Sequence, residues 1–276
     1  MEFYGLLGEK LSHSLSPEIH FEIFNSINKR GAYKLFEIEK ENLSDFAKAL
    51  KLLKVKGCNV TIPYKKDIMK ELDGISEEAA KIGAVNTIYL NNGSLQGFNT
   101  DYYGFGVLLK ISSIEVKDFV VVILGNGGAS RAVLHYLLDN GAKEVYIVSR
   151  KPNNDEYNLR NVKVISYKEI KDIKGDILIN STPVGMYPNV AESPVSKDII
   201  NNFTYIVDLI YNPYETKFLS YGKELNKKIV GGLYMLIGQA VKAQEIWHET
   251  SIDQRIIRDI YNKINVKFLN NNNNNI

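Results

Sequence analysis

Short apolar runs rich in β-branched residues alternate with stretches of helical periodicity along nearly the whole chain. This alternation is typical of α/β proteins, in which helices cover a mainly parallel sheet. The runs that predict strands are residues 3–7, 32–38, 57–61, 84–90, 119–124, 144–148, 176–180, 205–210 and 228–230. We therefore expect an α/β fold built on open, mainly parallel sheets.

Apolar stripes at helical spacing lie between these runs. One follows Ser16, which we expect to cap a helix that has Pro17 as its first residue. Another follows Gly128 and stops at Gly141, and a long one covers residues 233–247. Helices therefore fill most of the gaps between the predicted strands.

The composition is that of an ordinary globular protein, with 45% hydrophobic and 24% charged residues among 276. The 34 Lys and Arg residues nearly balance the 32 Asp and Glu residues, which disfavours a nucleic acid as partner. The apolar runs are far shorter than the ~20 residues that cross a bilayer, and the first residues lack the pattern of a signal peptide. With the single cysteine Cys58 there is no internal disulfide. We expect a cytoplasmic monomer or homodimer that acts on a small molecule, with no membrane or nucleic-acid partner.

A glycine-rich turn joins the run at 119–124 to the next helix, with the sequence Gly125-Asn126-Gly127-Gly128-Ala129-Ser130. Gly125 would permit a tight turn, and Gly127 would let the backbone approach a pyrophosphate at the N-terminus of the helix. Ser130 stands where the dinucleotide-binding pattern has its third glycine. The alternative is a tight turn without a ligand. The order of strand, turn and helix favours a dinucleotide site.

Basic residues follow the strand predicted at 144–148, namely Ser149, Arg150 and Lys151. An NAD-binding protein places an acidic residue there to hold the ribose 2′-hydroxyl. A hydroxyl beside two cations suits a 2′-phosphate instead, so the sequence predicts NADP. The alternatives are a solvated basic loop and, for NAD, a contact from Asp155 further along.

Polar residues that follow strand-like runs would gather at the carboxyl ends of a parallel sheet. In the first part of the chain they are Ser14, Ser16, Thr61, Lys65, Asn86 and Asp101. The serines could donate to a substrate carboxylate, the others could hold hydroxyls, and Lys65 can move a proton. Each residue also has a structural alternative as a helix cap, a turn residue or a surface charge. Spacing alone does not bring these residues together.

No Pro-rich or Gly/Ser-rich linker marks a domain boundary, so the boundary is inferred from the motifs. We expect a Rossmann-like NADP-binding domain at residues 103–232. Residues 1–102 and 233–276 would form the substrate-binding domain, and a cleft would separate the two.

The motifs that contain these residues closely resemble those of the shikimate dehydrogenase family. The resemblance spans nearly the whole chain and includes Asn-Val-Thr-Ile-Pro-Tyr-Lys at 59–65. The other matching segments lie at 4–8, 12–17, 83–87, 99–101, 125–130, 180–186, 208–213 and, around Gln239, 232–240. The resemblance implies a two-domain α/β enzyme that interconverts 3-dehydroshikimate and shikimate with NADPH, in the biosynthesis of chorismate and the aromatic amino acids.

The resemblance also implies roles for individual residues. Lys65 and Asp101 would be the catalytic pair. Ser14 and Ser16 would bind the substrate carboxylate, with Tyr211 nearby. The ring hydroxyls would contact Thr61, Lys65, Asn86, Asp101 and Gln239. NADP would bind to Gly125, Asn126, Gly127, Gly128, Ala129 and Ser130 and to Ser149, Arg150 and Lys151, and its nicotinamide side would face Thr182, Met186, Ile210, Gly232 and Met235.

The chain departs from the family pattern at two places. Ser149-Arg150-Lys151 replaces the usual Asn-Arg-Thr but keeps the arginine, and Gln244 replaces a phenylalanine. Two alternatives stay open, a quinate/shikimate dehydrogenase of broader specificity and a non-catalytic dinucleotide-binding regulatory module. The hydroxyls of Ser14 and Ser16 favour shikimate over quinate, and the presence of both Lys65 and Asp101 favours an enzyme. The histidines and the cysteine show no ligand spacing, so we expect no metal site.

Overall fold

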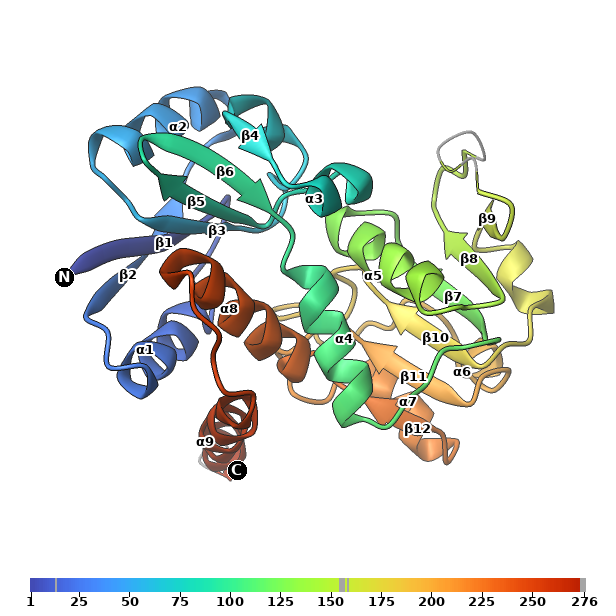
Figure 1. Ribbon diagram of the computed structural model, residues 1–276. Coiled ribbons are helices and arrows are strands. Elements are labelled where there is room, and N and C mark those ends of the chain that lie inside the picture. Colours follow the sequence, from blue (N-terminus) through green and yellow to red (C-terminus); the bar gives the residue numbers. More distant parts are fainter. Residues whose placement is uncertain (13, 154–156, 158, 274–276) are drawn as a thin grey trace. The chain divides into compact units, whose positions relative to one another are not determined.

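A computed structural model describes residues 1–12, 14–153, 157 and 159–273 (Figure 1). Contacts divide the chain into two compact units, unit 1 with Met1–Gly104 and Ile237–Ile276, and unit 2 with Phe105–Leu236. The division falls inside helices α4 (Asp101–Ile111) and α8 (Leu233–His248), whereas the motifs place it near the first residues of the same helices. None of the described helices is both long and apolar enough to span a membrane.

Unit 1 contains a mixed sheet with the strand order β2-β1-β3-β5-β6-β4. Its strands are β1 (Glu2–Gly8), β2 (Gly31–Glu37), β3 (Gly57–Val60), β4 (Gly74–Ile75), β5 (Thr87–Asn91) and β6 (Ser94–Phe98). β1 pairs in parallel with β2 and β3, whereas β5 is antiparallel to both of its neighbours. The amino end of β5 therefore lies at the same edge of the sheet as the carboxyl ends of β1, β3 and β6.

The strand predictions for unit 1 need two corrections. The predicted strand at 84–90 begins only at Thr87, and β4 and β6 were not predicted. β5 and β6 form a hairpin whose two-residue turn is Asn92-Gly93, both with positive φ (48° and 81°). Asn-Gly is the sequence pattern of such a turn, because both positions need a left-handed backbone.

The helices of unit 1 lie around this sheet, and the last of them packs against the first. They are α1 (Ser16–Ser26), α2 (Leu43–Leu52), α3 (Glu77–Ile82), part of α8 and α9 (Arg255–Asn273), with the 3₁₀ turns η1 (Lys40–Asn42) and η2 (Asp67–Glu71). Trp247 of α8 is fully buried and packs against Tyr4 of β1 at 4.9 Å between ring centroids. The prediction that Ser16 caps α1 is wrong: Ser16 is already the first residue of the helix, and Leu15, whose side chain makes no hydrogen bond, holds the cap position.

Unit 2 is a Rossmann-like domain with a wholly parallel sheet in the order β12-β11-β10-β7-β8-β9. Its strands are β7 (Val120–Leu124), β8 (Glu144–Val148), β9 (Val162–Ile165), β10 (Ile177–Asn180), β11 (Tyr205–Asp208) and β12 (Lys228–Val230). All but β9 coincide with predicted runs. Strand order reverses between β7 and β10, and such folds place ligands at the carboxyl ends of the strands at this point.

Both faces of the second sheet are covered by helices (Figure 1). Val121 and Ile123 of β7 pack with α4 and α5 (Gly128–Asp139), whereas Val122 and Leu124 pack with α6 (Lys197–Ile200) and α7 (Lys217–Glu224). A short turn, η4 (Glu169–Asp172), completes the unit. A strand buried on both faces is apolar throughout, which explains the continuous run at 119–124.

Candidate active site

Lys65 and Asp101 form a largely buried ion pair at the polar edge of the first sheet. Lys65 Nζ lies 2.5 Å from Asp101 Oδ2, and the two side chains are only 13% and 8% exposed. Lys65 follows β3 and its carbonyl accepts from the Val85 amide at 2.8 Å, whereas Asp101 begins α4 directly after β6. The structure therefore brings together two groups that are 36 residues apart in the sequence.

Asn86 donates a hydrogen bond to the second oxygen of this carboxylate. Its Nδ2 donates to Asp101 Oδ1 at 2.8 Å, and its own Oδ1 accepts from the Thr100 amide at 2.7 Å and from Thr87 Oγ1 at 3.1 Å. Asn86 was expected to reach the edge by following a strand, but it directly precedes β5. It reaches the predicted edge because β5 runs antiparallel to β3.

The remaining predicted residues of unit 1 lie in loops that leave the same edge, or on α8. The Ser16 amide donates to Ser14 Oγ at 3.2 Å, in the segment between β1 and α1. Thr61 directly follows β3, and its amide donates to the Leu7 carbonyl at 2.9 Å. Gln239 of α8 is 8% exposed and its Oε1 accepts from Thr100 Oγ1 at 3.4 Å. Gln239 is thereby joined to the segment that carries Asp101.

The glycine-rich turn after β7 has room for a ligand at its backbone. Gly125 has φ +102°, and a side chain there would meet Thr182 Cγ2 at 2.9 Å. Gly127 is the cap residue of α5, and a Cβ on it would meet nothing within 4 Å. Ser130 is buried and its hydroxyl donates to the Gly127 carbonyl at 2.8 Å, so the third position tolerates serine. The open space at Gly127 fits the approach of a pyrophosphate to the helix N-terminus.

Arg131 and Tyr157 border this turn, although neither belongs to the glycine-rich motif. The Tyr157 hydroxyl donates to Asn126 Oδ1 at 2.5 Å, and Arg131 Cζ lies 5.2 Å from the centroid of the Tyr157 ring. A cation in the first turn of a helix faces the positive end of the helix dipole. This unfavourable placement of a cation is the sequence feature that could have singled out Arg131.

The basic residues follow β8, at the carboxyl edge next to the glycine-rich turn. Ser149 Oγ accepts from the Lys151 amide at 3.2 Å, which bends the chain, and the side chains of Arg150 and Lys151 are exposed. These cations are available to an anion in solution. Asp155, the alternative contact for NAD, lies outside the described residues.

A buried carboxylate organises the loops after β10 and β11. Asp208 Oδ1 accepts from Asn180 Nδ2 at 3.1 Å and from the Ile210 amide at 3.0 Å, and Oδ2 accepts from Thr216 Oγ1 at 2.6 Å. Asn180 Oδ1 in turn accepts from the amide and the hydroxyl of Thr182 at 3.0 and 2.7 Å. Burial raises the pKa of Asp208 to about 7.

The residues predicted for the nicotinamide side lie in or next to these loops. Ile210 and Met235 are buried, whereas Met186 is 42% exposed. Gly232 donates its amide to the Ile210 carbonyl at 3.1 Å, and a side chain on it would meet the Leu209 carbonyl oxygen at 2.2 Å. Gly232 is therefore required by packing as well as being a candidate ligand contact. Tyr211 follows Ile210 and is partly exposed.

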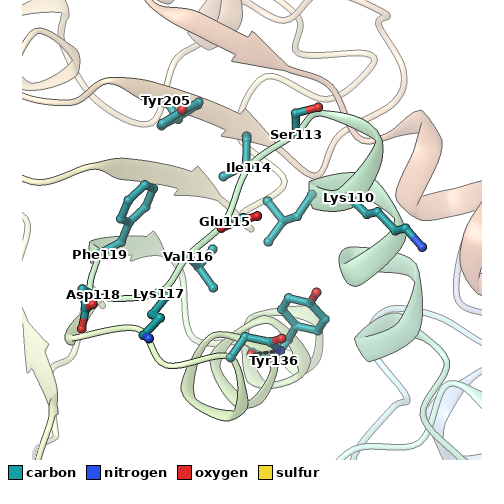
Figure 2. A pocket seen from close by; sticks show the side chains of 12 residues that line it. Lys110, Ser113, Ile114, Glu115, Val116, Lys117, Asp118, Phe119, Tyr136 and Tyr205 are labelled. Carbon is teal, nitrogen blue, oxygen red and sulfur yellow. Dashed lines mark hydrogen bonds between the residues drawn. The ribbon is translucent and has the colours of Figure 1, made fainter.

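A separate cavity of unit 2 lies at the opposite edge of the second sheet (Figure 2). Phe119, which precedes β7, and Tyr205, which begins β11, line it together with Val116 and Tyr136. It contains none of the predicted site residues. Among the described residues, no group of three or more His, Cys, Asp or Glu side chains is arranged to hold a metal ion.

Comparisons with known proteins agree with the motifs. The family model described as "Shikimate dehydrogenase substrate binding domain" matches residues 6–88. The "Shikimate dehydrogenase (NADP(+))" of Clostridium beijerinckii is 58% identical, over 95% of this chain and 97% of the relative. Among solved structures, shikimate dehydrogenase 1 of Peptoclostridium difficile has a TM-score of 0.94 at 53% identity and covers 97% of this chain and 99% of its own. The Thermus thermophilus enzyme "in complex with NADP(H) and shikimate" has a TM-score of 0.85 at 31% identity, with 95% and 99% covered. The chain belongs to the shikimate dehydrogenase family.

Proposed function

We propose that this protein catalyses the reversible, NADPH-dependent reduction of 3-dehydroshikimate to shikimate, a step in the biosynthesis of chorismate and the aromatic amino acids. The observation that carries the proposal is the Lys65–Asp101 pair held by Asn86 at the polar edge of unit 1. The close relatives are named shikimate dehydrogenase (NADP(+)), and the Thermus thermophilus structure holds both ligands.

Reduction of a ketone requires a hydride on carbon and a proton on oxygen. When bound, NADPH supplies the hydride. Lys65 donates the proton to the oxygen as negative charge develops on it, and in the reverse direction takes the proton from the hydroxyl. Asp101 orients the ammonium group and balances its charge in a largely buried position.

The other polar groups of unit 1 hold the substrate. Ser14 and Ser16 donate to its carboxylate, and Thr61, Asn86 and Gln239 contact the ring hydroxyls. Asn86 Nδ2 carries two hydrogens, of which Asp101 takes one. The second is available to a substrate oxygen. A contact from Tyr211 to the carboxylate stays a prediction that rests on the family resemblance.

Unit 2 binds NADP. The pyrophosphate lies at residues 125–130, where Gly127 leaves its backbone open. Ser149, Arg150 and Lys151 contact the 2′-phosphate, since charged donors pair with its oxygens. The nicotinamide side faces Thr182, Met186, Ile210, Gly232 and Met235, whose loops are held by Asn180 and Asp208.

An absorbance assay at 340 nm tests this function. Purified protein is given shikimate or quinate, each with NADP⁺ or NAD⁺, and the appearance of the reduced cofactor is followed. We expect turnover that is fastest with shikimate and NADP⁺. Equal or faster turnover of quinate would indicate the broader enzyme. Binding of NADPH by the folded protein without turnover of either substrate would indicate the regulatory module and refute the proposal.

A further inference from the structure

A line of buried polar side chains runs from Tyr33 of β2 to Asn86 in unit 1. The Tyr33 hydroxyl donates to Asn59 Oδ1 at 2.8 Å, and Asn59 Nδ2 donates to Thr87 Oγ1 at 3.1 Å. Thr87 Oγ1 then donates to Asn86 Oδ1 at 3.1 Å. Asn59 and Thr87 are 3% and 0% exposed. The proposed function gives no role to Tyr33, Asn59 or Thr87.

The order of donors gives this line a direction. Because the Tyr33 hydroxyl donates to Asn59 Oδ1, the NH₂ group of Asn59 is the end that faces Thr87. Thr87 Oγ1 accepts from Asn59 and also lies 3.0 Å from Thr100 Oγ1. When the Thr100 hydroxyl donates in that contact, the single hydrogen of Thr87 is directed to Asn86 Oδ1. Asn86 then presents its NH₂ group to Asp101 Oδ1. The reversed amide would place a carbonyl oxygen 2.8 Å from the carboxylate, which is repulsive.

The far end of the line is fixed by His20 and Gln244. The His20 ring stacks on Tyr33 with 4.2 Å between centroids and 13° between planes. His20 Nδ1 lies 2.8 Å from Gln244 Nε2, and accepts from it when the neutral ring carries its hydrogen on Nε2. Both side chains are fully buried, and burial lowers the pKa of His20 to about 3. This contact joins α1, which begins at Ser16, to α8, which carries Gln239.

We propose that Tyr33 is a positioning residue for the reaction: acting through Asn59 and Thr87, it fixes the amide orientation of Asn86 and thereby the Asp101 carboxylate relative to Lys65. The inference rests on the proposed function. Thr100 also holds Asn86 Oδ1, through its amide at 2.7 Å and its hydroxyl at 3.2 Å. Loss of the Tyr33 hydroxyl therefore weakens the orientation of Asn86 without abolishing it.

The first test is Tyr33→Phe, which removes the hydroxyl and keeps the ring that stacks on His20. We expect kcat for shikimate oxidation to fall about twofold to tenfold, the factor that the net contribution of one hydrogen bond corresponds to. The Tyr33 hydroxyl also interacts with Ser16, which is proposed to bind the substrate carboxylate, so a change in the KM for shikimate reports on Ser16 and the change in kcat reports on the Asp101 carboxylate. Tyr89→Phe is the matched control, because Tyr89 lies on the same sheet and its hydroxyl donates to Glu249 at 3.0 Å, away from the pair. Its kcat should equal that of the wild type.

A second test asks whether Tyr33 acts along this line. Thr87→Val should reproduce the loss in kcat, whereas Thr87→Ser keeps the hydroxyl and should retain the wild-type value. In the Thr87→Val background, Tyr33→Phe should cause no further loss, because the line is already broken. A purely structural effect of Tyr33 would lower kcat by the same factor in both backgrounds.

The outcomes separate the two proposals. A wild-type protein that does not oxidise shikimate refutes the proposed function. An active wild type in which Tyr33→Phe matches Tyr89→Phe, or in which Tyr33→Phe and Thr87→Val are additive, refutes the positioning role alone.

Discussion

The buried His20 makes the stability of unit 1 depend on pH in a way that can be calculated. Its neighbours include the rings of Tyr33 and Trp247 and the side-chain amides of Gln244 and Asn59, and none of these described groups carries a charge that would compensate an imidazolium. Burial lowers the pKa of His20 from 6.5 to about 3. Between these values the unfolded chain binds a proton that the folded chain does not, so stability is complete above pH 6.5 and is lost as the pH falls toward 3.

The expected magnitude follows from this difference. Each pH unit below 6.5 lowers the free energy of unfolding by about 1.4 kcal/mol, which amounts to about 2 kcal/mol at pH 5. Trp247 is the single tryptophan of the chain and lies 5.3 Å from the His20 ring, so its fluorescence reports on unit 1. Urea unfolding followed by this signal at pH 7.5, 6.5, 5.5 and 5.0 measures the effect.

The comparison with His20→Phe isolates this residue from other titrating groups. The variant keeps a ring against Tyr33 and Trp247 but has nothing to titrate. Its free energy of unfolding should fall by about 2 kcal/mol less than that of the wild type between pH 6.5 and 5. His248→Gln is a second comparison from the same cluster: burial also lowers the pKa of His248, but this side chain is only partly buried, so its removal should reduce the pH dependence by less than His20→Phe does. Identical pH dependence in the wild type and His20→Phe would refute the reasoning.

Further predictions concern the proposed site and the second unit. Lys65→Ala should lower kcat by about 100-fold or more, because the proton donor is lost; near-normal turnover at 340 nm would remove the assignment. Arg150→Ala should raise the KM for NADPH by about tenfold and leave that for NADH unchanged, since a charged contact to the 2′-phosphate is lost; a change of less than twofold would mean that Arg150 does not contact it. Gly127→Ala should leave the thermal midpoint unchanged, because a Cβ meets nothing within 4 Å, but should raise the KM for NADPH; a lowered midpoint with unchanged KM would contradict the pyrophosphate site. In unit 2 the raised pKa of Asp208, about 7, adds stability as the pH falls from 7 toward 3.8, and Asp208→Asn should remove this gain as measured by hydrogen exchange of β10 and β11.

The parallel sheet of unit 2 was the part of the fold most open to prediction. Its central strands are buried on both faces, so each is a continuous apolar run that stands out from the helices around it. The missed strand β9 lies at the edge of the sheet, and its Val-Lys-Val-Ile sequence includes an exposed lysine. The lysine interrupts the apolar run of this four-residue strand, so its sequence carries a weaker signal than the central strands do.

The motifs predicted which residues lie at the candidate site better than they predicted the hydrogen bonds that hold these residues. Lys65, Asn86 and Asp101 belong to distinctive segments, and the structure places them in contact. Tyr33 lies in an unremarkable strand, and its partner Asn59 is 26 residues away. Its hydroxyl can meet Asn59 only because β1 pairs with β2 on one side and with β3 on the other, in registers that place Tyr33 and Asn59 on the same face of the sheet. No periodicity within the chain contains that information.

Asn86 shows how a correct placement can rest on a wrong local structure. The expectation that it follows a parallel strand fails, since it precedes β5 and β5 is antiparallel. The amino end of an antiparallel strand lies at the same edge of the sheet as the carboxyl end of a parallel strand. The two errors, in the direction of the strand and in the end that carries Asn86, therefore cancel. Part of the signal was present in Asn92-Gly93, because a two-residue hairpin forces β5 and β6 to be antiparallel, so that one of them must run against β1 and β3. The pairing of β5 with β3 shows that β5 is the reversed strand. Asp101 therefore follows a strand that ends at the polar edge, and Asn86 reaches its carboxylate from the amino end of the strand between β3 and β6.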